Sequence, residues 1–130
     1  SVVRDAKNAE KLFPAKKKII HFMQPHHPFV TKEFDEPGFS DSFIEGANFD
    51  TIWDMAKKGK VSHDEVVEGY KENLEYVMRY VRELAEELDG KTVVTSDHGN
   101  FVGEGYIYGH RAGSKAKPLR KVPWHVVKTD

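Results

Sequence analysis

The fold is decided by the stretch Lys91-Thr92-Val93-Val94-Thr95-Ser96-Asp97-His98-Gly99. Its first part is a short run of β-branched residues, a composition that favours a buried strand over a helix. Asp97 and His98 follow where the strand gives way to a loop, and Gly99 permits a sharp turn after them. Because open α/β sheets bind ligands at the carboxyl ends of their strands, this strand end is a candidate binding site.

The side chains at this strand end are suited to a divalent metal. Asp97 offers carboxylate oxygens and His98 an imidazole nitrogen, and His110 is a third candidate ligand further along the chain. The nitrogen donors favour zinc or manganese, with calcium as the alternative. The competing interpretation is that Asp97 and Gly99 are ordinary turn residues and that His98 is a surface side chain.

Four motifs of the chain resemble those of the alkaline phosphatase superfamily, in its sulfatase-like branch. In that family a strand ends in Thr-Ser-Asp-His-Gly, as at residues 95–99, and a Gly-Glu and a Gly-His follow, as at residues 103–104 and 109–110. The family's last strand is announced by Arg-Val-Pro, matched by residues 120–123 with one Lys inserted. Upstream, the family's His-x-Pro-aromatic is matched by His26-His27-Pro28-Phe29.

The resemblance implies a three-layer α/β fold, with a mostly parallel sheet flanked by helices. It also implies a metal-dependent hydrolase that cleaves sulfate or phosphate esters. Enzymes of this family are much longer, and their nucleophile lies near the N-terminus. Residues 1–130 are therefore expected to be a single partial domain that lacks the N-terminal half and turns over little or nothing alone.

The resemblance also implies roles for individual residues. His26 would be catalytic and face the leaving group of the substrate. Asp97, His98 and His110 would bind the metal. His27, Arg111 and Lys115 would bind the anionic substrate. The alternative for the two histidines near Pro28 is a turn in which they only cap a strand.

Three strands and one long helix are predicted from the residues themselves. Apolar runs predict strands at residues 18–23, 91–96 and 122–127. Ser62 and Glu65 form a capping box, and apolar residues at steps of three and four follow, so a helix is predicted over residues 62–89. Since helical crossovers join parallel strands, the first two strands are predicted to be parallel neighbours or near-neighbours.

Parallel strands would place the predicted site residues together. The loops that follow the first two strands would meet at one edge of the sheet. Glycines between the second and third strands would let the chain fold back there. The residues expected to converge are His26, Asp97, His98 and His110.

Shorter helices are predicted near residues 3–13 and within residues 47–58. Residues 31–60 are polar but carry large aromatic side chains, and Pro37-Gly38 marks a turn. These aromatic residues either line a substrate pocket or fold back on the core: Phe34, Phe39, Phe43, Phe49 and Trp53.

Length and charge limit the possible partners. The chain has the size of one ordinary domain, and its net charge of −1 gives no strong field towards nucleic acid or an anionic membrane. No apolar run approaches the length of a membrane span, and the sequence favours a cytoplasmic protein. The expected partners are an anionic ester and either a second copy or the missing N-terminal half, bound through a sheet edge or residues 31–60. The alternative to an enzyme is a non-catalytic binding or assembly module with a degenerate phosphatase-like fold.

Overall fold

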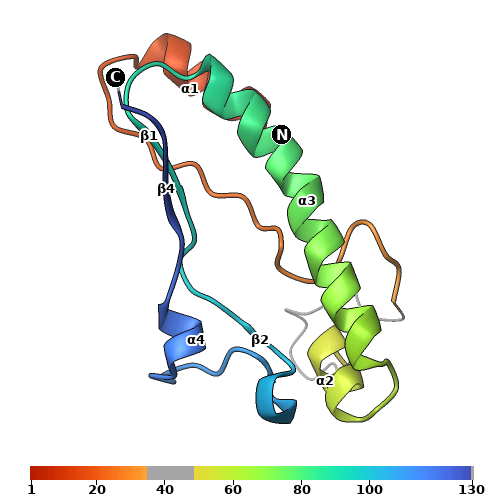
Figure 1. Cartoon of the computed structure of the whole chain (residues 1–130). Helices are drawn as coiled ribbons and strands as arrows, with labels where there is room; N and C mark the ends of the chain where they lie inside the picture. Colours follow the sequence, from red (N-terminus) through yellow and green to blue (C-terminus); the bar gives the residue numbers. More distant parts are fainter. Residues whose placement is uncertain (35–48, 130) are drawn as a thin grey trace.

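The computed structural model of the chain describes residues 1–34 and 49–129, and its longest element is the helix α3, His63–Glu87. Figure 1 shows α1 (Val2–Leu12) beside the C-terminal end of α3 and α2 (Ile52–Lys57) near its N-terminal end. The strands β1 (Thr92–Thr95) and β4 (Trp124–Lys128) run on the other side of the molecule.

The helix predicted over residues 62–89 is confirmed, with the expected start. The Ser62 hydroxyl accepts a hydrogen bond from the Glu65 N–H (3.2 Å), and the Glu65 carboxylate accepts one from the Ser62 N–H (2.8 Å). Two of the N–H groups that lack an intrahelical partner at the helix N-terminus are therefore satisfied. The helix ends at Glu87, and Gly90 takes a left-handed conformation (φ 75°) shortly after it.

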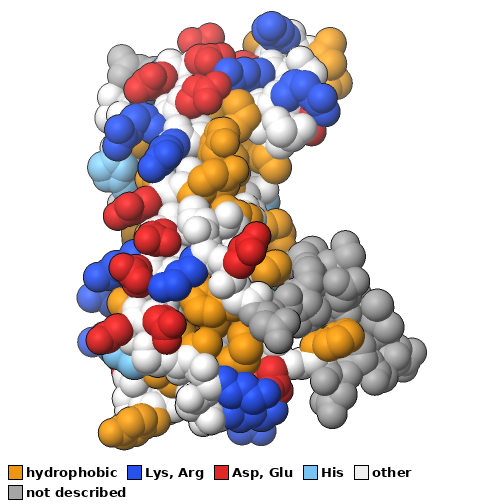
Figure 2. Space-filling view, turned by 90° about the vertical axis from the view of Figure 1, so that its right-hand side faces the viewer, with side chains coloured by type: hydrophobic (Ala, Val, Ile, Leu, Met, Phe, Trp, Pro, Cys, Tyr) orange, Lys and Arg blue, Asp and Glu red, His pale blue; other side chains and the backbone are white. Residues whose placement is uncertain are grey.

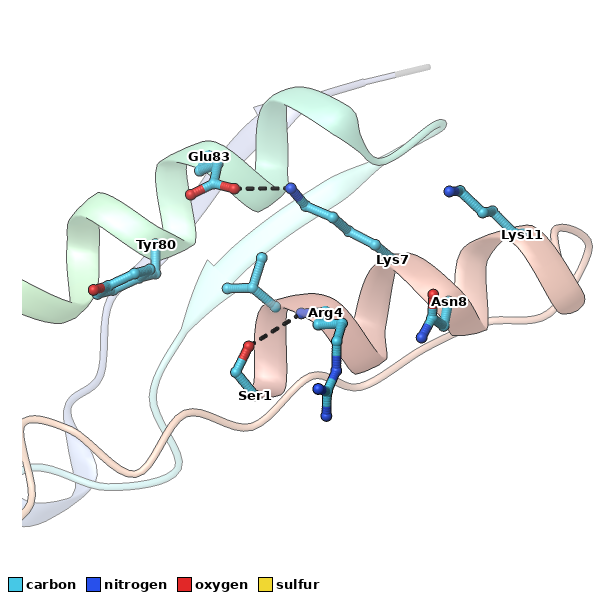
Figure 3. Close-up of a pocket in the computed structure, with 8 residues that line it drawn as sticks. Ser1, Arg4, Lys7, Asn8, Lys11, Tyr80 and Glu83 are labelled. Carbon is cyan, nitrogen blue, oxygen red and sulfur yellow. Dashed lines mark hydrogen bonds and ion pairs between the residues drawn. The ribbon is translucent and has the colours of Figure 1, made fainter.

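The two shorter helices are also confirmed. Ser1 caps α1, and Lys7 of α1 reaches two carboxylates of α3, on Glu83 (2.8 Å) and Glu87 (2.7 Å). Figure 3 shows Lys7 extending towards Glu83 beside a surface cavity of about 480 Å³ between the two helices. Thr51 caps α2 and shares a capping box with Asp54.

The main core lies where α2 meets the first half of α3. It contains the buried residues Phe29, Ile52, Trp53, Met55 and Val66, with partly buried aromatic residues around them. Phe34 and Trp53 therefore belong to the core, whereas Phe49 is exposed. Phe39, Phe43 and the turn predicted at residues 37–38 lie outside the described residues.

The prediction of a three-layer, mostly parallel sheet is wrong. The described residues form two separate two-stranded sheets, and both are antiparallel. In the first, β1 pairs with β4, with Thr95 opposite Trp124. In the second, β2 (Phe101–Val102) pairs with β3 (Tyr108–Gly109).

The error has two physical causes. Parallel strands need a long crossover, but the only α-helix between β1 and β4 in the described chain is α4, Lys117–Arg120, a single turn. In addition, residues 18–23 pair with no strand of the described chain, and Ile19 is 99% exposed. The strands predicted at residues 91–96 and 122–127 do exist, with slightly different bounds.

None of the helices in the described ranges combines the length and the apolar character needed to cross a membrane.

Candidate functional site

His26 and His27 lie in the loop that leads from residues 18–23 into the core. Their rings are stacked, with centroids 4.6 Å apart and planes 20° from parallel. The His27 ring meets Trp53 edge-on at 6.0 Å between centroids, and the His26 ring nitrogen Nδ1 contacts the carbonyl of His27. The pair therefore packs against the aromatic core through the His27 ring.

Asn73 of α3 is hydrogen-bonded to this loop at two points. Its side chain is fully buried, its Oδ1 accepts a hydrogen bond from the Val30 N–H (3.1 Å), and its Nδ2 donates one to the His26 carbonyl (3.2 Å). The two bonds reach the backbone on both sides of His27. Sequence reasoning missed Asn73, although a polar residue inside the apolar stripe of a helix is a signal that could have found it.

Asp97 and His98 follow β1, as predicted. The Asp97 carboxylate accepts a hydrogen bond from the His98 backbone N–H (2.9 Å), and the His98 Nδ1 lies 2.9 Å from the carbonyl of Gly99. The Gly99 N–H donates to the carbonyl of Leu119 in α4 (3.0 Å), which fixes the turn after the two side chains.

The chain after β3 runs back towards the loop that follows β1, so that the His110 ring lies next to the His98 ring. The two rings lie with centroids 4.2 Å apart. Gly109 makes this return possible, because it has a left-handed φ of 74° and its backbone packs against the Trp53 ring.

A hydrogen-bonded chain orients the His110 ring. Asn100 donates from Nδ2 to the Tyr70 hydroxyl (3.3 Å), so its Oδ1 faces the His110 Nδ1 at 2.7 Å. Since Oδ1 can only accept, Nδ1 of His110 carries the hydrogen, and in the neutral ring Nε2 carries the lone pair. Sequence reasoning also missed Asn100, which lies in a loop, and the orienting role of Tyr70, which lies on the apolar stripe of α3.

The environment lowers the pKa of His110. Partial burial of the ring is the largest cause, and the charges of His98 and His26 act in the same direction. Asp97 raises the pKa and His27 lowers it, with smaller effects. These interactions place the other three histidines and Asp97 within electrostatic range of His110. We call this group the histidine cluster: His26, His27, Asp97, His98 and His110.

The structure brings the His98 and His110 rings together and leaves His26 and Asp97 within electrostatic range of His110, but not by the predicted route. Parallel strands were expected to bring the loops together, and β1 is the only strand that leads into the cluster as expected. The loop at residues 24–30 is instead held in place by its hydrogen bonds to Asn73 of α3.

The chain was compared with protein-family models, curated proteins and solved structures. Nothing matches. The resemblance to the alkaline phosphatase superfamily thus rests on the short motifs alone.

The predicted metal site is contradicted. Within residues 1–34 and 49–129, no group of three or more His, Asp, Glu or Cys side chains is arranged to hold a metal ion. The side chains of the predicted ligands are turned to local partners: Asp97 to the N–H of its neighbour, His98 to a carbonyl, and His110 to an amide. Zinc, manganese and calcium were all expected on the basis of these residues, and the correction applies to all three.

Arg111 and Lys115 were expected to meet the substrate. Arg111 is exposed on the turn after His110, and its side chain makes no hydrogen bond or ion pair with the described residues. Lys115 lines a second cavity, formed around α4. The lining of this cavity includes neither His98 nor Asn100, the two residues whose contacts with His110 are described above.

Proposed function

We propose that the histidine cluster binds the anionic group of a sulfate or phosphate ester, and that the chain is the substrate-contacting part of a hydrolase of such esters. The observation that carries the proposal is the 4.2 Å approach of the His98 and His110 rings, within electrostatic range of His26 and His27. Imidazole N–H groups are hydrogen-bond donors, and their bonds to phosphoryl or sulfuryl oxygens strengthen when the ring is charged.

Crowded imidazoles favour an anionic ligand for an electrostatic reason. Each protonated ring makes protonation of the others harder, as the lowered pKa of His110 illustrates. A bound dianion reverses this effect because it stabilises the charged form of every ring that it contacts. Anion binding and proton uptake by the cluster are therefore coupled.

In the catalytic form of this proposal, His26 acts as the general acid. Its ring would donate a proton to the leaving-group oxygen, a step that contributes about 10²- to 10⁴-fold to the rate in enzymes that use it. His98 and His110 would hold the anionic group. The nucleophile would come from sequence N-terminal to this chain, as the family resemblance implies. A cytoplasmic location, which the sequence favours, is part of the same proposal.

A non-catalytic binding module is the second candidate. The observation in its favour is that the Nδ1 atoms of His98 and His110 both have partners inside the loop, the Gly99 carbonyl and the Asn100 amide. Such bonds would let the histidines hold the loop rather than transfer protons.

Binding is tested by titration of the chain with inorganic phosphate and sulfate, with the ring resonances followed by NMR. The His98 and His110 resonances should shift on titration, and the double substitution His98→Gln/His110→Gln should weaken binding at least tenfold. His21→Gln and His125→Gln are matched controls, because both histidines are exposed and lie outside the cluster. Equal weakening by the controls would refute the proposed site.

Turnover separates the enzyme from the binding module. Aryl sulfate and aryl phosphate hydrolysis is measured on the natural gene product, with and without His26→Gln. A fall in kcat of about 100-fold or more supports the general-acid role. Tight phosphate binding without any turnover in the unsubstituted protein would favour the binding module.

A further inference from the structure

A second anion site is suggested by a cavity around α4. The cavity has a volume of about 290 Å³, and every residue that lines it is cationic: Lys115, Lys117, Arg120 and Lys121. It is a different place from the histidine cluster, so the inference below goes beyond the proposed function and does not rest on it.

The local sequence explains why the cations share one cavity. Pro118 lies at the start of α4, where its missing N–H is tolerated. Leu119 is the buried residue of this turn, at 6% exposure. Because residues three and four apart share a helix face, Lys117 gathers with Arg120 and Lys121 when Leu119 points inward.

The position of the cavity is fixed by the loop after β1. The Gly99 N–H donates to the Leu119 carbonyl (3.0 Å), and Gly99 lies so close to the Pro118 carbonyl that a Cβ could not fit between them. The backbone of α4, which carries the cations, is thus fixed against the loop that contains Gly99.

The four cations have no acidic partner among the described residues, in contrast to several lysines elsewhere in the chain. Lys7, Lys18 and Lys32 each pair with a glutamate, and Lys58 and Lys60 pair with Asp50. The side chains that line the α4 cavity make no hydrogen bond or ion pair with any residue in the described ranges. Four like charges around one cavity repel one another, and a bound anion would relieve this repulsion.

We infer that the α4 cavity binds a compact polyanion that carries two or more phosphate or sulfate groups. The Arg120 guanidinium offers a planar fork of donors to oxyanions, and the lysines add mobile point charges. A cavity of about 290 Å³ lies at the small end of ligand sites, which suits a short polyanion rather than a long polymer. The net charge of −1 gives the rest of the surface no general attraction for nucleic acid.

The test uses inorganic pyrophosphate and calorimetry at low ionic strength. The triple substitution Lys117→Ala/Arg120→Ala/Lys121→Ala should weaken pyrophosphate binding at least tenfold. The matched control is Lys11→Ala/Lys16→Ala/Lys17→Ala, which removes the same charge from exposed positions elsewhere. The control should change the affinity less than twofold, and Arg120→Lys alone should show an intermediate loss.

Three results would overturn the inference. Equal losses in the triple variant and its control would show a general charge effect. Loss of pyrophosphate binding in His98→Gln/His110→Gln but not in the triple variant would place the ligand on the histidine cluster. A short DNA or RNA oligonucleotide that binds more tightly than pyrophosphate through the same residues would show a polymer site. Failure of the histidine proposal leaves the α4 result unchanged, so the two can be told apart.

Discussion

Asn73 acts on the histidine cluster without belonging to it. Its amide links both ends of the loop at residues 26–30 to α3, and none of its surface is exposed. A buried amide that is satisfied on both sides restricts the backbone of the loop, and thereby the stacked rings of His26 and His27. Its role is to position these rings.

Asn73→Ala should lower the free energy of unfolding by about 2–4 kcal/mol, because the Val30 N–H and the His26 carbonyl are left unpaired. Urea unfolding measures this change. Asn8→Ala, at an exposed position of α1, is the control and should stay within about 0.5 kcal/mol. If Asn73→Ala leaves both the stability and the His26 and His27 ring resonances unchanged, the positioning role is refuted.

His110 gives the cluster a dependence on pH. Its pKa is lowered in the folded protein by burial and by His98 and His26, so the folded state binds fewer protons than the unfolded state. As the pH falls through the unfolded value of about 6.5, protonation therefore favours unfolding. The stability linked to His110 is present above that pH and is lost below it.

His98→Gln should raise the pKa of His110, because a positive neighbour is removed. NMR titration of the His110 ring protons measures the direction. Substitution of His125, which does not contribute to the pKa of His110, serves as the control. An unchanged or lower pKa in His98→Gln would contradict the electrostatic link between the two rings.

At this scale the histidines were proposed as site residues from the sequence, whereas the residues that orient them were not. His26, Asp97, His98 and His110 were predicted because each follows a strand-like run or a glycine. Asn73, Asn100 and Tyr70 were not, since their importance depends on contacts between distant segments. The metal was predicted from residue types and from the family resemblance, and the described residues contain no group of three or more His, Cys, Asp or Glu side chains that could hold one.

Among the elements, the helices could be predicted because their signals are local. Capping boxes at Ser62 and Thr51 and apolar stripes at helical spacing are contained within each helix. A strand needs a partner that local sequence does not reveal. Residues 18–23 have the composition of a strand and remain outside both sheets of the described chain.

The contact between the β1 exit loop and α4 depends on Gly99. A Cβ at this position would overlap the backbone carbonyl of Pro118, which cannot move aside without displacing α4. Gly99→Ala should therefore destabilise the protein by about 1–3 kcal/mol and weaken anion binding at both proposed sites.

Thermal unfolding and pyrophosphate titration measure the effect of Gly99→Ala. The control is Gly113→Ala, where the added methyl meets open space and the cost comes only from a left-handed φ of 76°. The prediction fails if Gly99→Ala binds pyrophosphate as the unsubstituted chain does, since the contact would then not position α4.

For the whole molecule, the topology could not be read from the chain order. The crossover rule predicted parallel strands at residues 18–23 and 91–96, but residues 18–23 lie outside both sheets of the described chain. The strand β1 instead pairs antiparallel with β4, to which no long crossover helix connects it in the described chain. The pairing of β1 with β4 is a long-range contact, and the apolar patterns of the two strands are compatible with either direction.

Several large apolar side chains are exposed on the surface of the described chain. Figure 2 shows hydrophobic side chains gathered in a stripe, with acidic and basic side chains beside it. On α3, Leu74 and Met78 are 40% and 39% exposed, and Trp124 of β4 is 72% exposed. In the described chain β1 and β4 each have one strand neighbour, so each leaves an edge open. Apolar stripes and open strand edges both promote association.

We therefore expect the chain to self-associate. Sedimentation should show an average mass that rises above 14.9 kDa with concentration. Leu74 and Met78 lie four residues apart and share a helix face, so Leu74→Glu/Met78→Glu should shift the mass towards the monomer. Tyr106→Glu is the control, because this exposed residue lies on η2 (Glu104–Tyr106) and not on the α3 face that carries Leu74 and Met78. A compact monomer at every concentration would contradict the expectation, whereas association that persists in the α3 variant would point to the open strand edges.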